Sequence, residues 1–337
     1  MKKAKLVVSG ILCAVMALSL VAVGGTKAAA EEAPAPSGAN YKILFMPKLT
    51  NIPYFQSTNE GAQEVAKELG IEVIYDGPTE ADASAQVQML ENYIAQGVDA
   101  IVVGPNDPAA VTSVLKKAGE AGIIVLDWDT QADPTVTDGS VYNVIDEEFG
   151  KHMVDKLVEY MGTDEGDIAI ITGGLEAANL NAWIDAGQEY MAEEYPGLNV
   201  VTIEPSNESQ DEAYQDTKDV LTAYPSVIGI LGYSSPTGPG CGKAIADMGL
   251  QDKVAVVANG LEEDCQEVLK NGGLKCACLW STQKLGRLSI ATAYYMLEND
   301  GAFPQEGEKI AGWSDPIISD GEHNVYLTAG GEDYEAK

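Results

Sequence analysis

The sequence predicts an α/β protein with two doubly wound parallel-sheet lobes joined by a hinge. Two observations carry this prediction: short β-rich runs alternate with helical runs from Tyr41 onward, and the strand-like runs are apolar throughout. Strands of this kind suit a parallel sheet that helices cover on both faces. A single sheet would have to hold about ten strands, which is less usual, so we expect two lobes.

The first series of elements begins with a buried strand at Lys42–Met46. In the helix that follows, the apolar positions of residues 61–69 repeat with helical spacing, and Gly70 ends it. The same pattern predicts strands at 72–75, 100–103 and 123–126, and helices near 84–96 and 109–121.

A second series follows Asn143. The pattern predicts helices at 149–161, 182–194, 211–223, 241–248 and 262–270, and strands at 167–172, 199–203, 227–231, 253–258 and 274–279. A long helical run from Gln283 to Asn299 comes after the last of these strands. Each series reads as one doubly wound unit.

The N-terminus has the order of a secretory signal peptide. Three lysines among the first five residues precede an apolar stretch from Leu6 to Val23 and an Ala28–Ala30 triplet. A transmembrane anchor is the alternative, but the acidic, Pro/Ala-rich linker at 31–40 favours cleavage after residue 30. Cys13 lies inside the apolar stretch, so a lipid anchor is not expected. We predict export to the periplasm or cell surface.

The net charge of the chain limits the classes of molecule that it can bind. Removal of residues 1–30 takes away four of the 20 basic residues and no acidic ones, which moves the formal net charge from −32 to −36. Such a field repels nucleic acid and opposes adsorption to an anionic membrane. We therefore expect a neutral or cationic small solute as ligand and no nucleic acid partner. After Glu31 no apolar stretch is long enough to cross a bilayer, so we expect a soluble protein, and we expect it to be a monomer.

Four cysteines remain after this cleavage: Cys241, Cys265, Cys276 and Cys278. They could form disulfides in an exported protein, but a chain of this size does not need them, so buried free thiols are favoured. Cys276 and Cys278 lie two apart in a β-like run and face the same way. With two histidines and no second cysteine pair, we expect no metal site.

Ligands of open parallel sheets bind beyond the carboxyl ends of the strands, so the residues there are the site candidates. Lys48 follows the first strand, and Tyr54, Phe55 and Gln56 follow it closely. Aromatic rings pack against the C–H faces of sugar rings, and polar groups bind sugar hydroxyls. The alternative is that Tyr54 and Phe55 only staple the start of the helix.

The fourth strand is followed by Asp127, Trp128 and Asp129. A carboxylate here could accept hydrogen bonds from two neighbouring hydroxyls, and Trp128 could form an apolar wall. A capping aspartate or a carboxylate pair for glycoside hydrolysis are the alternatives. In the second lobe, amides, hydroxyls and aromatic rings dominate the candidates: Asn179, Asn181, Trp183, Tyr233, Ser234, Ser235, Asn259 and Trp280.

The same loops offer no catalytic machinery. Neither His152 nor His323 stands at a strand end beside a nucleophile, and no Gly-x-Gly-x-x-Gly follows the first strand. We therefore expect that the protein is not an enzyme and that it has neither catalytic residues nor a cofactor.

The chain resembles the type I periplasmic-binding-protein family, in particular the branch with rhamnose-binding and autoinducer-2-binding proteins. The resemblance covers nearly all of residues 41–300. It is carried by Phe45-Met46-Pro47-Lys48-Leu49, Gly61-Ala62-Gln63, Ala66-Lys67-Glu68-Leu69-Gly70, Tyr75-Asp76-Gly77-Pro78-Thr79, Trp128-Asp129, Leu221-Thr222-Ala223-Tyr224 and Leu279-Trp280.

The resemblance implies a binding protein that closes its two lobes over a ligand and docks on the permease of an ABC importer. It also implies that Lys48 and Asp129 hold the ligand. Autoinducer-2 binders have an Asp-Gln pair where this chain has Asn179-Leu180, and a Pro-x-Ala where it has Tyr233-Ser234-Ser235. We therefore expect a monosaccharide or related sugar-like ligand, with autoinducer-2 as an alternative.

Two other functions are considered as alternatives to import. A receptor module could present the sugar to a chemoreceptor or sensor kinase. A ligand-responsive repressor is disfavoured, because a signal peptide takes the place of its basic helix-turn-helix.

The same resemblance suggests how the chain is divided. The first lobe is expected at 41–143 plus 283–306, and the second at 147–280 plus about 312–337. The hinge is expected to involve Asn143–Asp146, the segment around Ser281 and Thr282, and a third crossing near 307–318.

Overall fold

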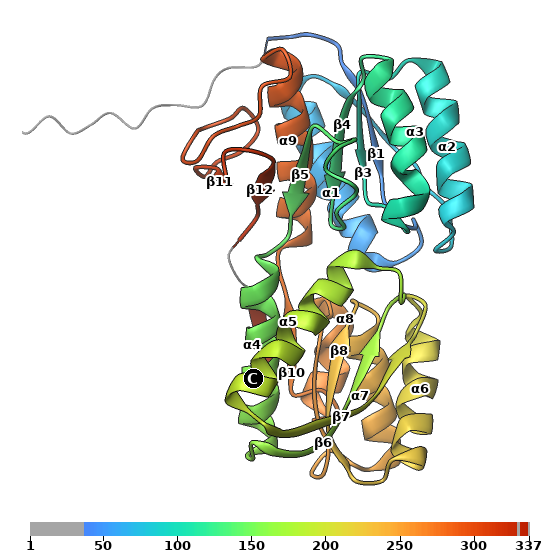
Figure 1. The fold of residues 1–337 in the computed structure, drawn as a ribbon, viewed down its shortest axis with the longest axis vertical. Coiled ribbons are helices and arrows are strands. Elements are labelled where there is room, and N and C mark those ends of the chain that lie inside the picture. The colour runs from blue at the N-terminus through green and yellow to red at the C-terminus, as the bar shows by residue number, and fades with distance from the viewer. Residues whose placement is uncertain (1–36, 329–330, 336–337) are drawn as a thin grey trace, which may run out of the picture. The chain divides into compact units, whose positions relative to one another are not determined.

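The computed structural model describes residues 37–328 and 331–335, which form two β-sheets, each covered by helices (Figure 1). The predicted signal peptide and residues 31–36 of the predicted linker lie outside the described residues.

The first sheet has seven strands in the order β11-β12-β5-β4-β3-β1-β2. All neighbouring strands are parallel except the pair β11 and β12, which is antiparallel. Its strands are β1 (Lys42–Met46), β2 (Glu72–Tyr75), β3 (Ala100–Val103), β4 (Ile124–Trp128), β5 (Gly139–Tyr142), β11 (Ile318–Ser319) and β12 (Asn324–Tyr326). Its helices are α1 (Pro53–Leu69), α2 (Ala83–Gln96), α3 (Pro108–Glu120) and α9 (Thr282–Glu298). We call this sheet with its helices the first lobe.

The second sheet has six strands in the order β13-β10-β9-β8-β6-β7, parallel except for the edge strand β13. Its strands are β6 (Glu165–Thr172), β7 (Gly197–Pro205), β8 (Val227–Tyr233), β9 (Ala255–Ala258), β10 (Cys276–Leu279) and β13 (Glu332–Glu335). Its helices are α4 (Asp146–Met161), α5 (Ala178–Glu194), α6 (Gln210–Ala223), α7 (Thr237–Met248) and α8 (Glu262–Lys270). We call this unit the second lobe.

Both sheets repeat one doubly wound strand order. The first five strands of each unit, counted along the chain, lie in the order 2-1-3-4-5. In such sheets the helices leave to opposite faces from the first strand and its neighbour, which opens a crevice at the carboxyl ends. The prediction of two doubly wound α/β lobes is confirmed.

Alternating burial along the central strands explains why both faces are covered. In β1, Ile43 and Phe45 pack into the cluster that contains α1 and α9, whereas Leu44 and Met46 pack into the cluster that contains α2 and α3. All four side chains are fully buried. The near-continuous apolar run that predicted a parallel strand therefore fills two cores, one on each face.

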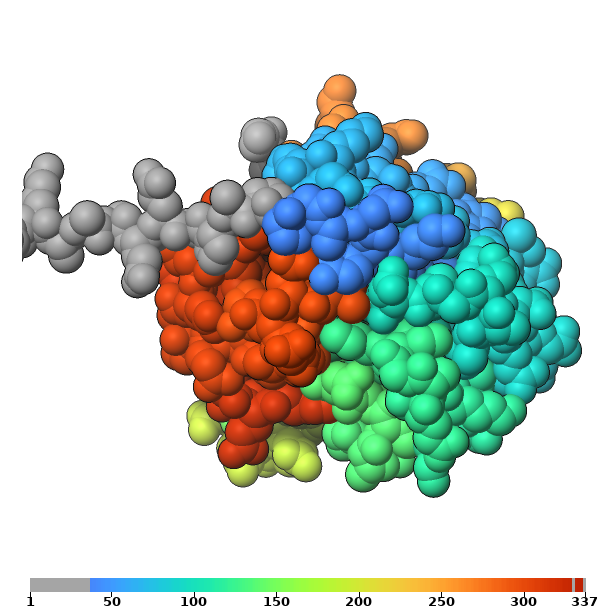
Figure 2. Space-filling model, turned by 90° about the horizontal axis from the view of Figure 1, so that it is seen from above, coloured from blue at the N-terminus to red at the C-terminus, as the bar shows by residue number. Residues whose placement is uncertain are grey.

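The helices α1 and α9 approach each other closely although they are far apart in the sequence. Glycines make this contact: a side chain at Gly61 would collide with the backbone of Gln283, and one at Gly286 with the backbone of Thr58. In Figure 2, orange-red atoms from the C-terminal part of the chain accordingly lie beside blue atoms near the N-terminus. Helix α9 thus packs on the first lobe.

The structure differs from the expectation for the last residues of the chain. Residues from about 312 onward were expected in the second lobe, but β12 pairs with β5 of the first sheet. Arg287 on α9 also donates to the carbonyl of Gly312 at 3.2 Å, and Ile310 is fully buried. The chain enters the second sheet only at β13. The chain therefore passes from the first sheet to the second between β12 and β13, after the expected 307–318.

None of the helices in the described part of the chain combines the length and apolar character needed to span a bilayer.

Substitution at Gly286 tests the helix contact. Gly286→Ala should lower the free energy of unfolding by about 1–3 kcal/mol, because a methyl group must displace the backbone of α1. Urea denaturation of both proteins measures this change.

Gly119→Ala is the matched control. Gly119 also lies in a helix, but open space surrounds the position that a methyl group would take. This substitution should raise stability by up to about 1 kcal/mol through helix propensity. Equal effects of the two substitutions would contradict the packing argument.

Candidate functional site

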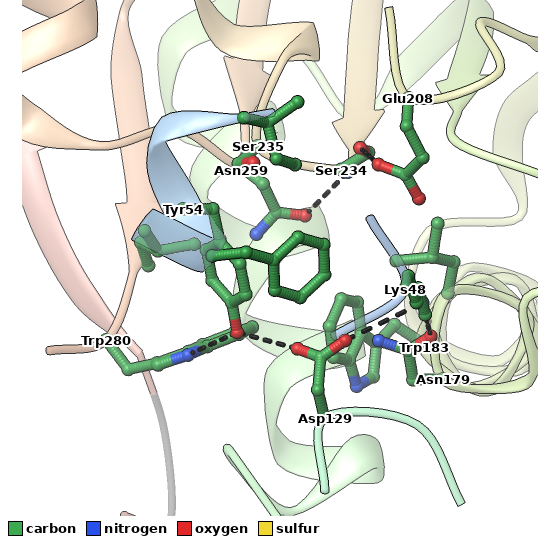
Figure 3. A pocket seen from close by; sticks show the side chains of 14 residues that line it. Lys48, Tyr54, Asp129, Asn179, Trp183, Glu208, Ser234, Ser235, Asn259 and Trp280 are labelled. Carbon is green, nitrogen blue, oxygen red and sulfur yellow. Dashed lines mark hydrogen bonds and ion pairs between the residues drawn. The ribbon is translucent and has the colours of Figure 1, made fainter. Parts of the chain in front are cut away.

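A cavity lies where the carboxyl ends of both sheets meet the start of α1 and α5 (Figure 3). The residues that line it come from both lobes and from the connection between β10 and α9: Lys48, Ile52, Tyr54, Phe55, Asp129, Asn179, Leu180, Trp183, Glu208, Ser234, Ser235, Asn259, Leu279 and Trp280.

A buried ion pair stands at the centre of the cavity. Lys48 Nζ lies 3.6 Å from Asp129 Oδ2, and the two side chains are only 4% and 6% exposed. Lys48 also donates to Asn179 Oδ1 at 3.1 Å, an atom that accepts a second hydrogen bond from Thr130 Oγ1 at 2.8 Å. Because Asn179 belongs to the second lobe, these contacts bridge the two sheets.

The backbone of Asp129 turns the carboxylate toward the cavity. Asp129 follows β4 directly and has φ 62°, a left-handed conformation that aspartate tolerates better than most residues. Its Oδ1 accepts hydrogen bonds from Tyr54 Oη at 2.6 Å and Asn143 Nδ2 at 3.0 Å. Burial and the Asp129 carboxylate raise the pKa of Tyr54 well above its usual value, so this hydroxyl stays a donor.

Indole rings form the wall on the side of the hinge. Trp280 Nε1 donates to Tyr54 Oη at 3.1 Å, which extends the polar chain from Asp129 (Figure 3). The rings of Trp183 and Trp280 meet edge to face, with centroids 5.5 Å apart, and Phe149 packs against both. Trp183 Nε1 is held by Asp146 Oδ1 at 2.8 Å. Both indole rings are therefore fixed by hydrogen bonds as well as by packing.

Neutral hydrogen-bonding groups dominate the opposite, second-lobe side. Asn259 accepts from the backbone N–H of Ser234 at 3.2 Å and donates to the carbonyl of Cys278 at 2.9 Å. The Ser234 hydroxyl donates to Glu208. These contacts fix the orientation of the amide and hydroxyl groups before any ligand binds.

The cavity is small in this conformation, about 30 Å³. Of the described residues that line the cavity, Lys48 is the one with a cationic side chain, against the carboxylates of Asp129 and Glu208. The site is therefore suited to a neutral polar ligand better than to a polyanion.

The family of the chain follows from a match over most of its length. A family model described as a periplasmic binding protein domain matches residues 43–301. The chain belongs to this family. This confirms the predicted resemblance, and the matched residues include β1 to α9 of both lobes.

Curated members of this periplasmic binding protein family show moderate similarity to the chain. A D-ribose/D-allose-binding protein of Pseudomonas aeruginosa is 25% identical over 261 residues, which is 75% of this chain and 81% of that protein. A D-apiose import binding protein of Actinobacillus succinogenes is 24% identical over 67% of this chain and 72% of that protein.

Solved structures share the fold of this chain. A solute-binding protein of Clostridium phytofermentas with bound L-rhamnose has a TM-score of 0.79 at 22% identity, covering 88% of this chain and 96% of that one. An AI-2 complex from Clostridium saccharobutylicum has a TM-score of 0.81 at 23% identity, covering 88% and 97%. The expected type I periplasmic-binding-protein fold is confirmed.

The structure brings nine of the sequence-predicted ligand candidates together at the cavity of this binding-protein fold. They are Lys48, Tyr54, Phe55, Asp129, Asn179, Trp183, Ser235, Asn259 and Trp280. Ser234, named beside them as a strand-end residue, lines it as well.

Asp127 and Trp128 do not line the cavity. Strand β4 runs to Trp128, two residues beyond its predicted end, so both residues lie inside the strand. Asp127 Oδ2 accepts from the backbone N–H of Ala132 at 3.0 Å. The Trp128 ring packs on Phe45, with centroids 4.3 Å apart, and its Nε1 donates to Met46. Asp127 therefore anchors a turn, and Trp128 fills the core.

Three other candidates also lie away from the cavity. Tyr233 is the last residue of β8, which exceeds its predicted end by two residues, and its ring is fully buried in the core. Gln56 lines a separate surface hollow beside α9. Asn181 uses its amide to hold the carbonyl of Leu175 at 2.8 Å.

Four lining residues were not among the candidates: Ile52, Leu180, Glu208 and Leu279. Glu208 stands three residues after β7, so the strand-end rule applied to that strand would have found it. Ile52, Leu180 and Leu279 are apolar and carry no signal that separates them from core residues.

Asp127 offers a test that is independent of any ligand. Burial raises the pKa of Asp127 to about 7, whereas an aspartate in the unfolded chain has a pKa of about 3.9. Between these values the folded protein holds a proton that the unfolded chain has lost, so this group lowers stability as pH rises from about 4 to about 7. Asp127→Asn should remove this contribution.

Urea denaturation of wild type and Asp127→Asn at about pH 5 and about pH 7.5 checks the prediction. The stability of the variant relative to wild type should improve at the higher pH. The same difference at both pH values would show that Asp127 is ionised in the folded protein.

Proposed function

We propose that the protein is the extracytoplasmic solute-binding component of an ABC importer and captures a monosaccharide or related sugar-like ligand between its two lobes. The observation that carries the proposal is the buried Lys48–Asp129 pair beside Asn179, enclosed by Tyr54 and Trp280 where the carboxyl ends of both sheets meet.

The chemistry of these groups suits a polyhydroxylated ring. The Asp129 carboxylate can accept hydrogen bonds from neighbouring hydroxyls, and Lys48 can donate to a ring or hydroxyl oxygen. Asn179 and Asn259 can both donate and accept. The indole rings of Trp183 and Trp280 offer apolar surface to the C–H groups of the ring.

Relatives in the family support the sugar class. The curated relatives bind D-ribose/D-allose and D-apiose according to their names, and the Clostridium phytofermentas structure contains L-rhamnose. An AI-2 complex shares the fold equally well, so AI-2 belongs in the panel of test ligands.

The arrangement supports binding and not catalysis. His152 on α4 has its Nε2 2.7 Å from Asp333 on β13, and the Nε2 of His323 lies 3.1 Å from the hydroxyl of Thr137. Both histidines therefore have partners away from the cavity. The two carboxylates that were considered as a hydrolytic pair do not share a site, because Asp127 holds a turn and only Asp129 lines the cavity.

Ligand entry requires movement. The cavity, about 30 Å³ in this conformation, is lined by side chains of both lobes, so we expect the lobes to part or the lining side chains to rotate as a ligand enters. The chain crosses between the lobes near Asn143, near Ser281 and between β12 and β13, and we expect rotation at such connections to open the site. The lobes closed over the ligand would then dock, as a monomer, on the membrane permease.

Export completes the proposal. The order of basic, apolar and small residues in residues 1–30 supports a cleaved signal peptide and release to the periplasm or the cell surface.

Asp129 gives the sharpest test of the site. Isothermal titration calorimetry against aldoses, deoxysugars, polyols and AI-2 should identify a ligand with a Kd below about 100 μM. Asp129→Ala should weaken that ligand at least about 100-fold, because it removes charge-assisted hydrogen bonds of about 1.5–3 kcal/mol each.

Asp127→Asn is the matched control, since Asp127 lies two residues earlier on the same chain segment but outside the cavity. It should bind with unchanged affinity. The proposal fails if no member of the panel binds, and the site assignment fails if Asp129→Ala, folded by circular dichroism, keeps wild-type affinity.

A further inference from the structure

A second cluster of chemically active side chains lies away from the cavity, at the edge of the second sheet. Two cysteines on β10, two carboxylates on β13 and a histidine on α4 meet there: Cys276, Cys278, Asp333, Glu335 and His152. The dark red segment of β13 is visible behind α4 in Figure 1.

The register of the sheet explains why these residues meet. Strand β13 is antiparallel to β10 and pairs Cys278 with Asp333 and Cys276 with Glu335. Directly paired residues project from the same face of a sheet. That face is the one covered by α4, because both cysteines pack in the cluster that contains Phe149 of α4.

The distances are those of a chelating group. Cys276 Sγ and Cys278 Sγ are 3.5 Å apart, and both residues are fully buried. The ligand atoms of His152, Cys278 and Asp333 lie within 4.8 Å of one another, as do those of Cys276, Asp333 and Glu335. The two groups share Asp333, and the thiol contact joins them.

We propose that Cys276, Cys278, His152 and Asp333 form a binding site for a divalent zinc ion. Two thiolates, one imidazole and one carboxylate are ligands that Zn²⁺ takes in tetrahedral sites. The sulfur ligands argue against Ca²⁺ and Mg²⁺, which bind oxygen.

Two of the ligand pairs are already close to the separations that a zinc site requires. Two thiolates on a tetrahedral zinc are about 3.8 Å apart, and an imidazole nitrogen and a carboxylate oxygen about 3.3 Å. The cysteine sulfurs are 3.5 Å apart, and His152 Nε2 and Asp333 Oδ1 are 2.7 Å apart. A disulfide fits less well, because residues two apart in a strand are about 6.6 Å apart, more than its β-carbons allow.

The surroundings of the cluster provide both support and access. Lys156 Nζ lies 3.3 Å from Asp333 Oδ2 and 3.0 Å from Glu335 Oε1, so it holds the second carboxylate oxygen while Oδ1 faces His152. Contacts of this type orient the ligands of a metal. The side chains of His152 and Asp333 are 32% and 25% exposed, which gives the ion an entry path from solvent.

The sequence analysis predicts the opposite for these cysteines. It predicted no metal site because the chain has two histidines and no second cysteine pair. The missing ligands come instead from α4 and from β13, separated from Cys278 by 126 and 55 positions. The four cysteines of the described chain are free and buried, as the favoured reading of the sequence predicted.

Cobalt substitution tests the site directly. Purified protein is reduced, stripped of metal with a chelator and titrated with Co²⁺, then with Zn²⁺. One equivalent of Co²⁺ should produce a thiolate-to-cobalt charge-transfer band and tetrahedral d–d bands, and one equivalent of Zn²⁺ should abolish them.

Variants separate this site from other metal-binding groups. The double variant Cys276→Ser/Cys278→Ser should lose the charge-transfer band, and His152→Ala should weaken Zn²⁺ at least about tenfold. Cys265→Ser, which changes another buried cysteine on α8, should bind as wild type does. His152→Ala changes a partly exposed residue and decides the question if the double variant does not fold.

Two results overturn the proposal. The first is the absence of a charge-transfer band in folded, reduced wild-type protein, which would leave an ion-pair cluster of His152, Lys156 and Asp333. The second is Zn²⁺ binding with wild-type affinity in both the double variant and His152→Ala, which would place the ion on other surface groups.

Discussion

The parallel 2-1-3-4-5 order of both sheets is the constraint on which the rest of the structure depends. Parallel strands need crossover helices, and these helices cover both faces of each sheet. Only the strand ends remain free to build a site, and the carboxyl ends of β1, β4 and β8 supply Lys48, Asp129 and Ser234. Function in this fold therefore depends on a few residues in the first positions after each strand.

The contacts within the cavity carry an electrostatic consequence. A lysine and a carboxylate that are both nearly inaccessible to water lose hydration, and this cost is offset only by close polar partners. Lys48 pairs with Asp129 and donates to Asn179, while Asp129 accepts hydrogen bonds from Tyr54 and Asn143. If the proposed binding site is correct, a ligand that enters must supply equivalent hydrogen bonds to these groups. This requirement selects molecules with several hydroxyl groups in fixed positions and discriminates against apolar ones of the same size.

The helices and most strands were predictable from the sequence because apolar periodicity reports burial directly, but β5, a strand of four residues, was not predicted. Element ends were less predictable, and the site depended on them: two extra residues in β4 and in β8 moved Asp127 and Tyr233 from the cavity into the interior. The short strands β11, β12 and β13 contain two to four residues and carry no periodic signal. Their pairing is decided by distant partners, so neither the third crossing nor the cluster of side chains around Cys278 was predicted.

The glycine contact between α1 and α9 also has a consequence for the order of folding. The hydroxyls of Ser57 and Thr282 meet at 2.7 Å across 225 positions of the chain. The second lobe, by contrast, is one continuous segment from α4 to β10 and lacks only its edge strand. During synthesis the second lobe can therefore gain most of its core before the first lobe can close. Folding of the first lobe has to wait for this long loop to close, and such non-local contacts form slowly.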